Sequence, residues 1–306
     1  MRDSHVGSLI KPRRLSPGGT IGVVAPAGPV DPTDLHRGVE QLERIGFKVI
    51  LGRHIEKRDR FFAGRDAERA EDLQGMFENS EIDAVVCARG GSGSARLLRH
   101  LDPTRLAHHP KIFVGCSDIT TLLLYFSRSL GWVTFHGPMV APQFGKDPSR
   151  LREENFLRVL GGETVGMTFP AVRTLRPGTG EGVLTGGCLT LICTTIGTPY
   201  EIETDGKVLF IEETDEAPYR IDRMLSYLKS LGKFDRLRGV VVGQMPRCQP
   251  ESVPEIILEI FDKSSGPILF NFPSGHGESI ATLPFGTPVR IDGTIASLRM
   301  EEPAVV

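Results

Sequence analysis

Two side chains that can act as nucleophiles, Cys116 and Ser117, are neighbours in the segment KIFVGCSDITTLLLYF, residues 111–126. This segment begins as a buried strand and ends as an amphipathic helix. A parallel strand that runs straight into a helix places the corner residue at the carboxyl edge of the sheet, where open α/β sheets bind ligands. Gly115 permits a tight approach, and the N–H groups at the start of the helix suit a developing oxyanion. The pattern therefore indicates a site for acyl-transfer chemistry.

The same corner also has a purely structural explanation. Ser and Asp are preferred helix caps, and the G-x-S-D of residues 115–118 matches only half of the G-x-S-x-G nucleophile elbow. On this stretch alone, a capping Ser117 is the commoner case. If Ser117 does face a cleft, alternation along the strand turns Cys116 toward the packed side, which argues against the thiol as nucleophile.

A nucleophilic serine needs a general base, and the base needs a partner that holds its tautomer. Of the eight histidines, His136 in TFHGPM and His276 in FPSGHGES both follow an apolar strand, so both are expected at a sheet edge. His276 lies between two glycines and is the more approachable; His136 is the second candidate. A lone histidine in a glycine loop is nevertheless more often structural than catalytic.

The carboxylate partner is expected in VLFIEETDEAPYRIDRML, where Glu212 ends an apolar strand. This position again implies a sheet edge over a cleft. Glu213, Asp215 and Glu216 lie close by and remain alternatives. Acidic residues before a helix also interact favourably with its dipole, which is their structural explanation.

A glycine-rich turn, CARGGSGSARLL, follows another apolar strand at residues 87–98. Gly90, Gly91 and Gly93 expose backbone N–H groups and leave room for a ligand. The stretch matches neither G-x-G-x-x-G nor a Walker G-K-[ST] motif, so a dinucleotide or phosphate site is poorly supported. A ligand cradle and a simple tight turn fit it equally well.

The elements that carry these candidates alternate between strands and helices from residue 20 to about residue 138. Asp31 suits the N-cap and Pro32 the first position of one helix. The expected strands lie within 20–28, 83–89, 111–115 and 132–135, and the expected helices include 31–46 and about 66–78. Such alternation implies βαβ units and a mainly parallel sheet, so the first half is predicted to be an α/β domain.

The secondary structure of the second half is harder to predict from the sequence. Residues 139 to about 180 are expected to be irregular, because they end in the Pro/Gly-rich RPGTGEG at 176–182. The patterns that follow predict helices at 186–197, 218–232 and 254–261, and strands at 207–213, 239–245 and near 287–300. This half is α+β or α/β, and its strand order cannot be derived from the pattern.

Composition excludes several classes of protein. The chain has 306 residues, is 40% hydrophobic and 24% charged, and carries a formal net charge of −2, as ordinary soluble globular proteins do. Nothing favours nucleic acid or an anionic membrane as a partner. No apolar run approaches the roughly 20 residues of a membrane span, and the polar N-terminus does not resemble a secretory signal. The five cysteines show no CxxC or zinc spacing, which favours a reducing cytoplasm and no metal site.

Taken together, the motifs resemble the LD-carboxypeptidase family of serine peptidases, typified by muramoyltetrapeptide carboxypeptidases and also including microcin-immunity-type hydrolases. The resemblance covers about residues 18 to 290, and its motifs occur in the family's order. The matching stretches are VVAPAGPV, FAGRDAERAEDL, ARGGSGSARLL, GCSDIT, TFHGPM, LTGGCLTLICTTIGTPY, LFIEETDEAPYRIDRML and GHGES.

The resemblance implies a catalytic triad of Ser117, Glu212 and His276, because the family uses the first acidic residue after the strand. It implies a flavodoxin-like, parallel-sheet N-terminal domain that carries the serine and a distinct C-terminal α/β domain that carries Glu and His, with the active site between them. The corresponding expected ranges are 18–140 for the first domain, 141–180 for a linker and 181–302 for the second domain.

The resemblance also implies an activity: release of a terminal D-amino acid from an L-configured centre, such as D-alanine from cytoplasmic murein tetrapeptide during peptidoglycan recycling. The alternative is a microcin-immunity-type hydrolase of peptidyl nucleotides. No metal or organic cofactor is expected, and the family suggests a homodimer. Backbone N–H groups of Asp118 and Gly91 are expected to form the oxyanion hole.

Two departures from the family pattern concern the substrate cleft. Ser92 stands where the family commonly has Tyr, and Cys188 stands where it commonly has Asn. Both positions, together with Gly90, are candidates for lining the cleft, so they leave the identity of the substrate peptide open.

Overall fold

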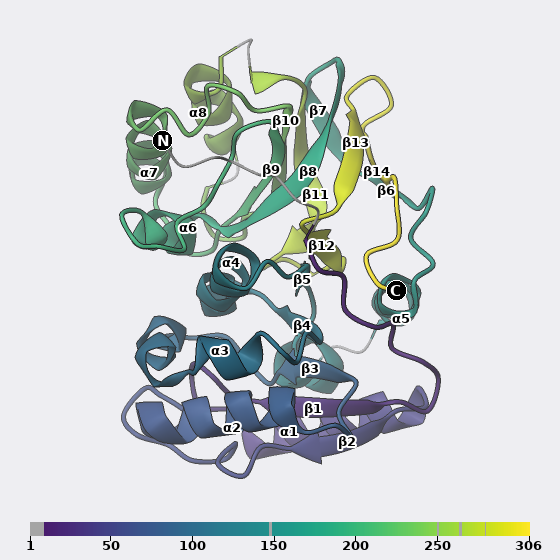
Figure 1. The fold of residues 1–306 in the computed structure, drawn as a ribbon. Coiled ribbons are helices and arrows are strands. Elements are labelled where there is room, and N and C mark those ends of the chain that lie inside the picture. The colour runs from purple at the N-terminus through teal and green to yellow at the C-terminus, as the bar shows by residue number, and fades with distance from the viewer. Residues whose placement is uncertain (1–8, 147–148, 250, 263–264, 279) are drawn as a thin grey trace.

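The structure is a computed structural model that describes residues 9–146, 149–249, 251–262, 265–278 and 280–306. Two β-sheets lie one above the other, with helices packed beside each (Figure 1). In the part of the chain that is described, none of the helices could span a lipid bilayer. The fold is therefore a two-layered α/β architecture built from both halves of the chain.

The first sheet has six strands in the order β12-β5-β4-β3-β1-β2. Its strands are β1 Thr20–Val24, β2 Lys48–Leu51, β3 Ala84–Cys87, β4 Ile112–Gly115, β5 Thr134–His136 and β12 Leu283–Phe285. All neighbours pair in parallel except β12, which is antiparallel to β5. The order of the five parallel strands, 2-1-3-4-5, is that of flavodoxin, so the predicted flavodoxin-like domain is confirmed.

The helices of this half follow the predicted pattern. They are α1 Pro32–Arg44, α2 Asp66–Glu78, α3 Pro103–Leu106 and α4 Thr120–Ser129, with 3₁₀ turns η1 Ser94–His100 and η2 Ser117–Ile119. Asp31 caps α1 as predicted, accepting hydrogen bonds from the N–H groups of Thr33 and Asp34 at 2.9 and 3.1 Å. This cap and Pro32 begin the helix where the sequence indicated.

The second sheet has eight strands in the order β6-β14-β13-β8-β9-β10-β11-β7. Its strands are β6 Thr168–Pro170, β7 Arg173–Arg176, β8 Thr179–Cys188, β9 Lys207–Glu212, β10 Gly239–Gln244, β11 Ile268–Gly275, β13 Pro288–Asp292 and β14 Ser297–Met300. The four strands from β8 to β11 are parallel, and the outer strands are antiparallel. This half is thus a mixed α/β layer.

Both faces of the second sheet are buried, which explains its apolar strands. On β9, Val208 and Phe210 face a core shared with the first sheet, whereas Leu209 and Ile211 face a second core with three helices. Those helices are α6 Leu189–Thr195, α7 Pro218–Ser230 and α8 Val253–Ile260. Alternate residues of one strand therefore serve different layers, as the period of two requires.

The expectation of an irregular segment over 139–180 is wrong. The segment contains a π-helix, η3 Val140–Lys146, a helix, α5 Arg150–Gly161, and the strands β6 and β7 at opposite edges of the second sheet. The strands are short and pair with partners far along the chain, so local alternation could not reveal them. A smaller correction concerns residues 186–188, which end strand β8 and are not the start of a helix.

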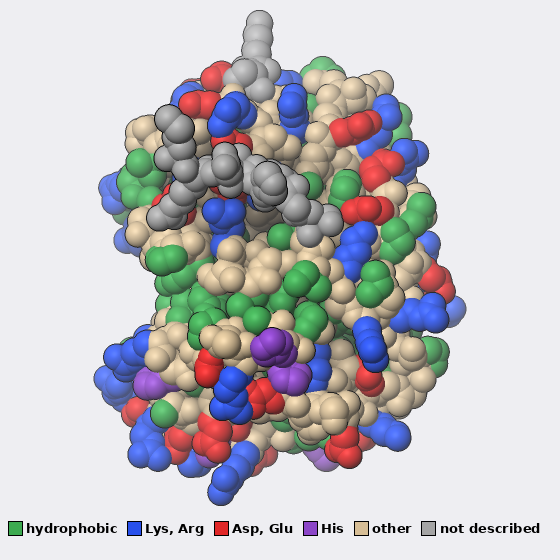
Figure 2. All heavy atoms as spheres, in the orientation of Figure 1, with side chains coloured by type: hydrophobic (Ala, Val, Ile, Leu, Met, Phe, Trp, Pro, Cys, Tyr) green, Lys and Arg blue, Asp and Glu red, His purple; other side chains and the backbone are tan. Residues whose placement is uncertain are grey.

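The two halves of the chain are interlocked. Strand β12 crosses from the C-terminal half to the edge of the first sheet, and one hydrophobic core runs through both layers. On the face shown in Figure 2, positive and negative side chains are interspersed, and hydrophobic side chains gather at the waist between the two layers. Each layer therefore depends on the other for burial of its apolar face.

Candidate active site

Ser117 occupies the corner between β4 and α4 with a strained backbone. Its φ is +61°, in the left-handed region that residues other than glycine rarely adopt. A Cβ on Gly115 would lie 2.6 Å from Cγ2 of Ile119, so only glycine permits so sharp a turn. A serine held in this conformation at a strand exit matches the nucleophile elbow, and such strain is concentrated at functional sites.

The structure of the corner disfavours both a helix-capping role for Ser117 and a nucleophilic role for Cys116. The N-cap residues of η2 and α4 are Cys116 and Ile119, and neither makes a side-chain cap hydrogen bond, so the structure does not support the alternative of a capping Ser117. Cys116 is 2% exposed, which confirms that it points to the packed side, whereas Ser117 is half-buried. Burial, and secondarily the charge of Glu212, raise the pKa of the Cys116 thiol well above its usual range. Of the two neighbours, the serine is the one that remains available.

The glycine-rich turn packs directly against Ser117. A Cβ on Gly90 would lie 2.8 Å from Cβ of Ser117, and the Gly90 carbonyl accepts a hydrogen bond from the Gly28 N–H at 3.0 Å. Gly91 has a φ of +121°, so the turn is tight as well as close to the serine. The chain therefore turns sharply at these glycines, and Gly90 also lies against the serine corner.

Asp118 fastens this turn to the corner. Its carboxylate accepts a hydrogen bond from the Ser94 N–H at 2.8 Å, and its carbonyl accepts one from the Ser94 hydroxyl at 2.7 Å. Gly91 and Ser92 are exposed beside it. The turn after β3 is thus locked next to Ser117 with its tip open to solvent.

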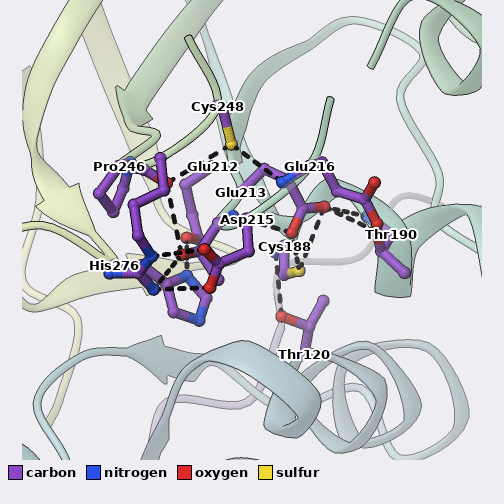
Figure 3. A network of polar contacts seen from close by, with 12 residues as sticks. Thr120, Cys188, Thr190, Glu212, Glu213, Asp215, Glu216, Pro246, Cys248 and His276 are labelled. Carbon is purple, nitrogen blue, oxygen red and sulfur yellow. Dashed lines mark hydrogen bonds and ion pairs between the residues drawn. The ribbon is translucent and has the colours of Figure 1, made fainter. Parts of the chain in front are cut away.

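His276 and Glu212 come together from two strands of the second sheet. Glu212 ends β9 and is fully buried, while His276 directly follows β11 and its side chain is 21% exposed. Oε2 of the carboxylate lies 2.5 Å from Nδ1 of the imidazole (Figure 3). A Cβ on Gly275 would lie 2.9 Å from Cβ of Glu212, so the glycine allows this close approach.

The contact with Glu212 changes the pKa of the His276 imidazole. Burial lowers the pKa of His276, but the hydrogen bond and charge of Glu212, followed by the charge of Glu213, outweigh burial and hold the pKa above its ordinary value of 6.5. A carboxylate that faces one ring nitrogen fixes the tautomer and stabilises the protonated ring. The pair is therefore equipped to accept and hold a proton.

His136, the second candidate base, has a different environment. It is fully buried on β5, with its ring centroid 4.9 Å from that of Phe210 and 5.8 Å from that of Phe285. Burial, and then the charge of His276, lower its pKa to about 3. Neither ring nitrogen has a hydrogen-bond partner among the described residues. His136 is thus a neutral ring in the core, with no carboxylate to orient it.

The remaining acidic candidates have other partners. Glu213 is buried and accepts hydrogen bonds from the N–H and hydroxyl of Thr190 at 2.8 and 2.7 Å, at the start of α6. Asp215 pairs with Arg247, which donates to its carboxylate at 2.7 Å. Arg220 contacts Glu216 at 3.4 Å. Among these four acids, Glu212 is the one whose carboxylate accepts a hydrogen bond from the His276 ring.

A short chain of contacts connects the serine corner to this pair. The Cys188 N–H donates to the Thr120 hydroxyl at 3.1 Å, and Cys188 lies opposite Glu212 in the pairing of β8 with β9 (Figure 3). Within the described residues, no hydrogen bond joins the Ser117 hydroxyl to the His276 ring. The Ser117 corner and the pair of Glu212 and His276 thus meet at one junction between the sheets, without a hydrogen bond between Ser117 and His276 among the described residues.

Two participants in this junction were missed from the sequence. Thr120 follows Ser117 by three residues on the same helical turn, which is a signal that could have been used. Arg247 lies in a loop after β10 and its position carried no local signal. Across the described ranges, no group of three or more His, Cys, Asp or Glu side chains is arranged to hold a metal ion.

Comparison with known proteins identifies the family of the chain. Residues 21–137 match the LD-carboxypeptidase N-terminal domain, and residues 181–291 match the LD-carboxypeptidase C-terminal domain. The chain belongs to the LD-carboxypeptidase family. This is a family of serine carboxypeptidases, so the resemblance inferred from the motifs is confirmed.

Several relatives of this LD-carboxypeptidase family member are known. The chain is 39% identical over 285 residues to a probable murein peptide carboxypeptidase of Bacillus subtilis, covering 90% of this chain and 89% of the relative. A solved muramoyltetrapeptide carboxypeptidase from Oxalobacter formigenes superposes with a TM-score of 0.81 at 28% identity, covering 92% of this chain and 97% of that one.

A second group of relatives has a higher similarity in fold but another named role. The microcin C7 self immunity protein MccF, solved in complex with aspartyl sulfamoyl adenosine, has a TM-score of 0.90 at 26% identity, and the match covers 97% of this chain and all of that chain. Fold similarity is thus higher for MccF, whereas sequence identity is higher for the probable murein peptide carboxypeptidase of Bacillus subtilis, so the two measures together do not separate the two activities.

Proposed function

We propose that this chain is a serine-type LD-carboxypeptidase that hydrolyses the amide bond between an L-configured centre and a terminal D-amino acid. The observation that supports it most is the pairing of His276 with a buried Glu212 at the junction where Ser117 stands in a strained, left-handed conformation. Ser117 is the nucleophile, His276 the general base and Glu212 the group that orients the base.

The reaction proceeds through a covalent ester. Ser117 Oγ attacks the substrate carbonyl carbon while its proton passes to Nε2 of His276, because Nδ1 faces Glu212. The tetrahedral intermediate collapses as the C–N bond breaks and the imidazolium returns the proton to the leaving amine. Water then attacks the ester, gives a proton to His276 and releases the carboxylate product, and Ser117 recovers its proton.

The oxyanion forms beside the glycine-rich turn. Backbone N–H groups of Asp118 and Gly91 are the proposed donors, since the turn is locked onto the corner through Ser94. One such donor contributes about 3 kcal/mol to lowering the barrier. The Ser117–His276 contact closes in the substrate complex, as catalytic hydrogen bonds often tighten only there.

The substrate we propose is the murein tetrapeptide, from which the enzyme releases D-alanine in the cytoplasm during peptidoglycan recycling. The names of the relatives from Bacillus subtilis and Oxalobacter formigenes support this choice. All five cysteines are free thiols, which fits a reducing compartment. The triad needs no organic cofactor or metal, and we propose a homodimer by analogy with the family.

The direct test is incubation with the L-Ala-D-Glu-diaminopimelate-D-Ala tetrapeptide and detection of free D-alanine by mass spectrometry. We expect release by the wild-type chain, no release by Ser117→Ala, and no cleavage of the diastereomer that ends in L-alanine. Absence of D-alanine from the wild-type reaction would contradict the proposal.

A second candidate function is hydrolysis of peptidyl nucleotides, as the MccF match suggests. A nucleotide-directed cleft is expected to offer an aromatic ring for stacking on the base. The single tryptophan, Trp132, is 1% exposed and packs against Phe77 and Phe126 in the core, so it cannot serve. Turnover of a peptidyl adenylate without release of D-alanine from the tetrapeptide would favour this candidate.

A further inference from the structure

The loop that carries His276 is held from outside by helix α5. Arg152 on α5 is only 6% exposed, and its Nη2 donates to the carbonyl of Glu278 at 3.0 Å, two residues after His276. One helical turn later, the side-chain oxygen of Asn155 accepts a hydrogen bond from the Thr282 N–H at 2.6 Å. One helix face thus contacts this loop at two points.

The base of the same loop is closed by its own hydrogen bonds. The Ala281 N–H donates to the carbonyl of Pro273 at 2.9 Å, and the Ser274 hydroxyl donates to the carbonyl of Ala281 at 2.8 Å. These bonds fix where the loop starts and ends. Between these two ends, Arg152 binds the backbone close to the imidazole through its hydrogen bond to the Glu278 carbonyl.

Arg152 is also connected, through η3, to the layer that carries the serine. Its Nη1 donates at 2.6 Å to the carbonyl of Gln143 in η3. From the same π-helix, the Ala141 N–H donates to the carbonyl of Ala88 at 3.0 Å, and Ala88 lies just before the turn that packs against Ser117. One guanidinium therefore bridges the His276 loop and a segment fastened to the Gly90 turn.

We propose that Arg152 is a positioning residue that sets the placement of His276 relative to Ser117. This inference rests on the proposed serine mechanism and deepens it. The planar guanidinium binds two carbonyls in fixed directions, whereas a lysine offers a compact point charge on a flexible stem. Removing Arg152 leaves both carbonyls without this donor and allows the loop to drift, and a misplacement of about 1 Å can cost 100-fold in rate.

The charged and titratable groups around His276 influence the pKa of its imidazole. They are Glu212 at the end of β9, Glu213 and Asp215 after it, Arg247 after β10 and His136 on β5. Since the contact with Glu212 raises the pKa of His276, a loop that drifts from Glu212 lowers this pKa. A variant that merely destabilises the fold leaves the pKa in the folded molecules unchanged.

The experiment measures how fast a fluorophosphonate labels Ser117, by intact-protein mass spectrometry between about pH 5 and 9. For Arg152→Ala we expect labelling about 10- to 100-fold slower than in the wild type, with the acid-side midpoint at lower pH. Added guanidinium ion at non-denaturing concentration is expected to restore part of the rate. Arg150→Ala is the matched control, because Arg150 is exposed on the same helix and, among the described residues, its ion pair is a local one with Glu154.

The outcomes separate the two proposals. A wild-type chain that is not labelled at Ser117 contradicts the serine mechanism itself. Wild-type labelling combined with an Arg152→Ala rate and midpoint equal to those of Arg150→Ala overturns the inference for Arg152. If Arg152→Ala does not fold, Arg152→Lys replaces it: slower labelling with a lowered midpoint supports the inference, and unchanged labelling overturns it.

Discussion

The two parts of the candidate site are built in different ways. The serine corner is local: β4, η2 and α4 are contiguous, and the strain at Ser117 arises within a few residues. The pair of Glu212 and His276 joins residues 64 positions apart, and it depends on the parallel packing of β9, β10 and β11. A corner of this kind can be recognised in a sequence, whereas such a pair requires a complete sheet.

The largest effect is expected at the corner. Ser117→Ala should lower kcat about 10⁶-fold, because the nucleophile is lost. Ser117→Gly should be equally inactive but more stable than Ser117→Ala by about 1 kcal/mol, since glycine accepts the positive φ. Steady-state kinetics and thermal unfolding check both statements. Equal stability of the two variants would show that the corner is not strained.

The pair is expected to be next in importance. Glu212→Gln should lower kcat about 10⁴-fold, because the amide does not hold the imidazole as a base. Glu213→Gln is the control: it should lower Tm, since Glu213 holds the start of α6, but retain far more activity per folded molecule. If Glu213→Gln proves to be the more damaging variant for kcat, the assignment of the orienting carboxylate is wrong.

The close approach of the glycine turn gives a third test. Gly90→Ala places a Cβ 2.8 Å from Cβ of Ser117 and should lower kcat about 100-fold by displacing the corner. Gly75→Ala on α2 has no atom within 4 Å of its new Cβ, and should raise stability by about 0.5–1 kcal/mol with unchanged kcat. Similar kinetics for both variants would show that the turn does not position the serine.

The pH dependence distinguishes the two histidines. A general base must be neutral, so activity is lost as pH falls through its pKa. Because the pKa of His276 is raised, the acid-side midpoint of kcat/KM is expected above 6.5. If His136 were the base, the midpoint would lie near 3. A pH–rate profile on the tetrapeptide measures this midpoint directly.

The smallest effect is expected from the thiols. Burial raises the pKa of Cys116 and Cys188 well above the usual range, so both stay protonated and react slowly. Treatment of the folded chain with iodoacetamide should therefore leave kcat nearly unchanged. Loss of activity on alkylation, together with activity that survives Ser117→Ala, would transfer the nucleophile to a cysteine.

Much of the first layer could be predicted from local pattern. The helix over Asp66–Glu78, the Asp31 cap and the strand that runs into Ser117 follow from periodicity and capping, because these interactions are formed within a few residues. The same local signals singled out the serine corner, the two strand-end histidines and the acidic cluster after β9. Ordered motifs along the chain then identified the family.

The tertiary structure alone decided how these pieces meet. One acidic residue ends β9 and three more follow it, and the packing of β11 against β10 brings His276 to Glu212. Strand β12 returns to the first sheet, and α5 places Arg152 against the His276 loop, although local pattern left that region as a linker. The partners are 64 positions apart in the pair of Glu212 and His276 and 126 positions apart in the contact of Arg152 with Glu278, so no periodicity within a short window can indicate them. The sequence by itself thus determined which side chains could react, and the long-range packing of the two sheets determined which of them face one another.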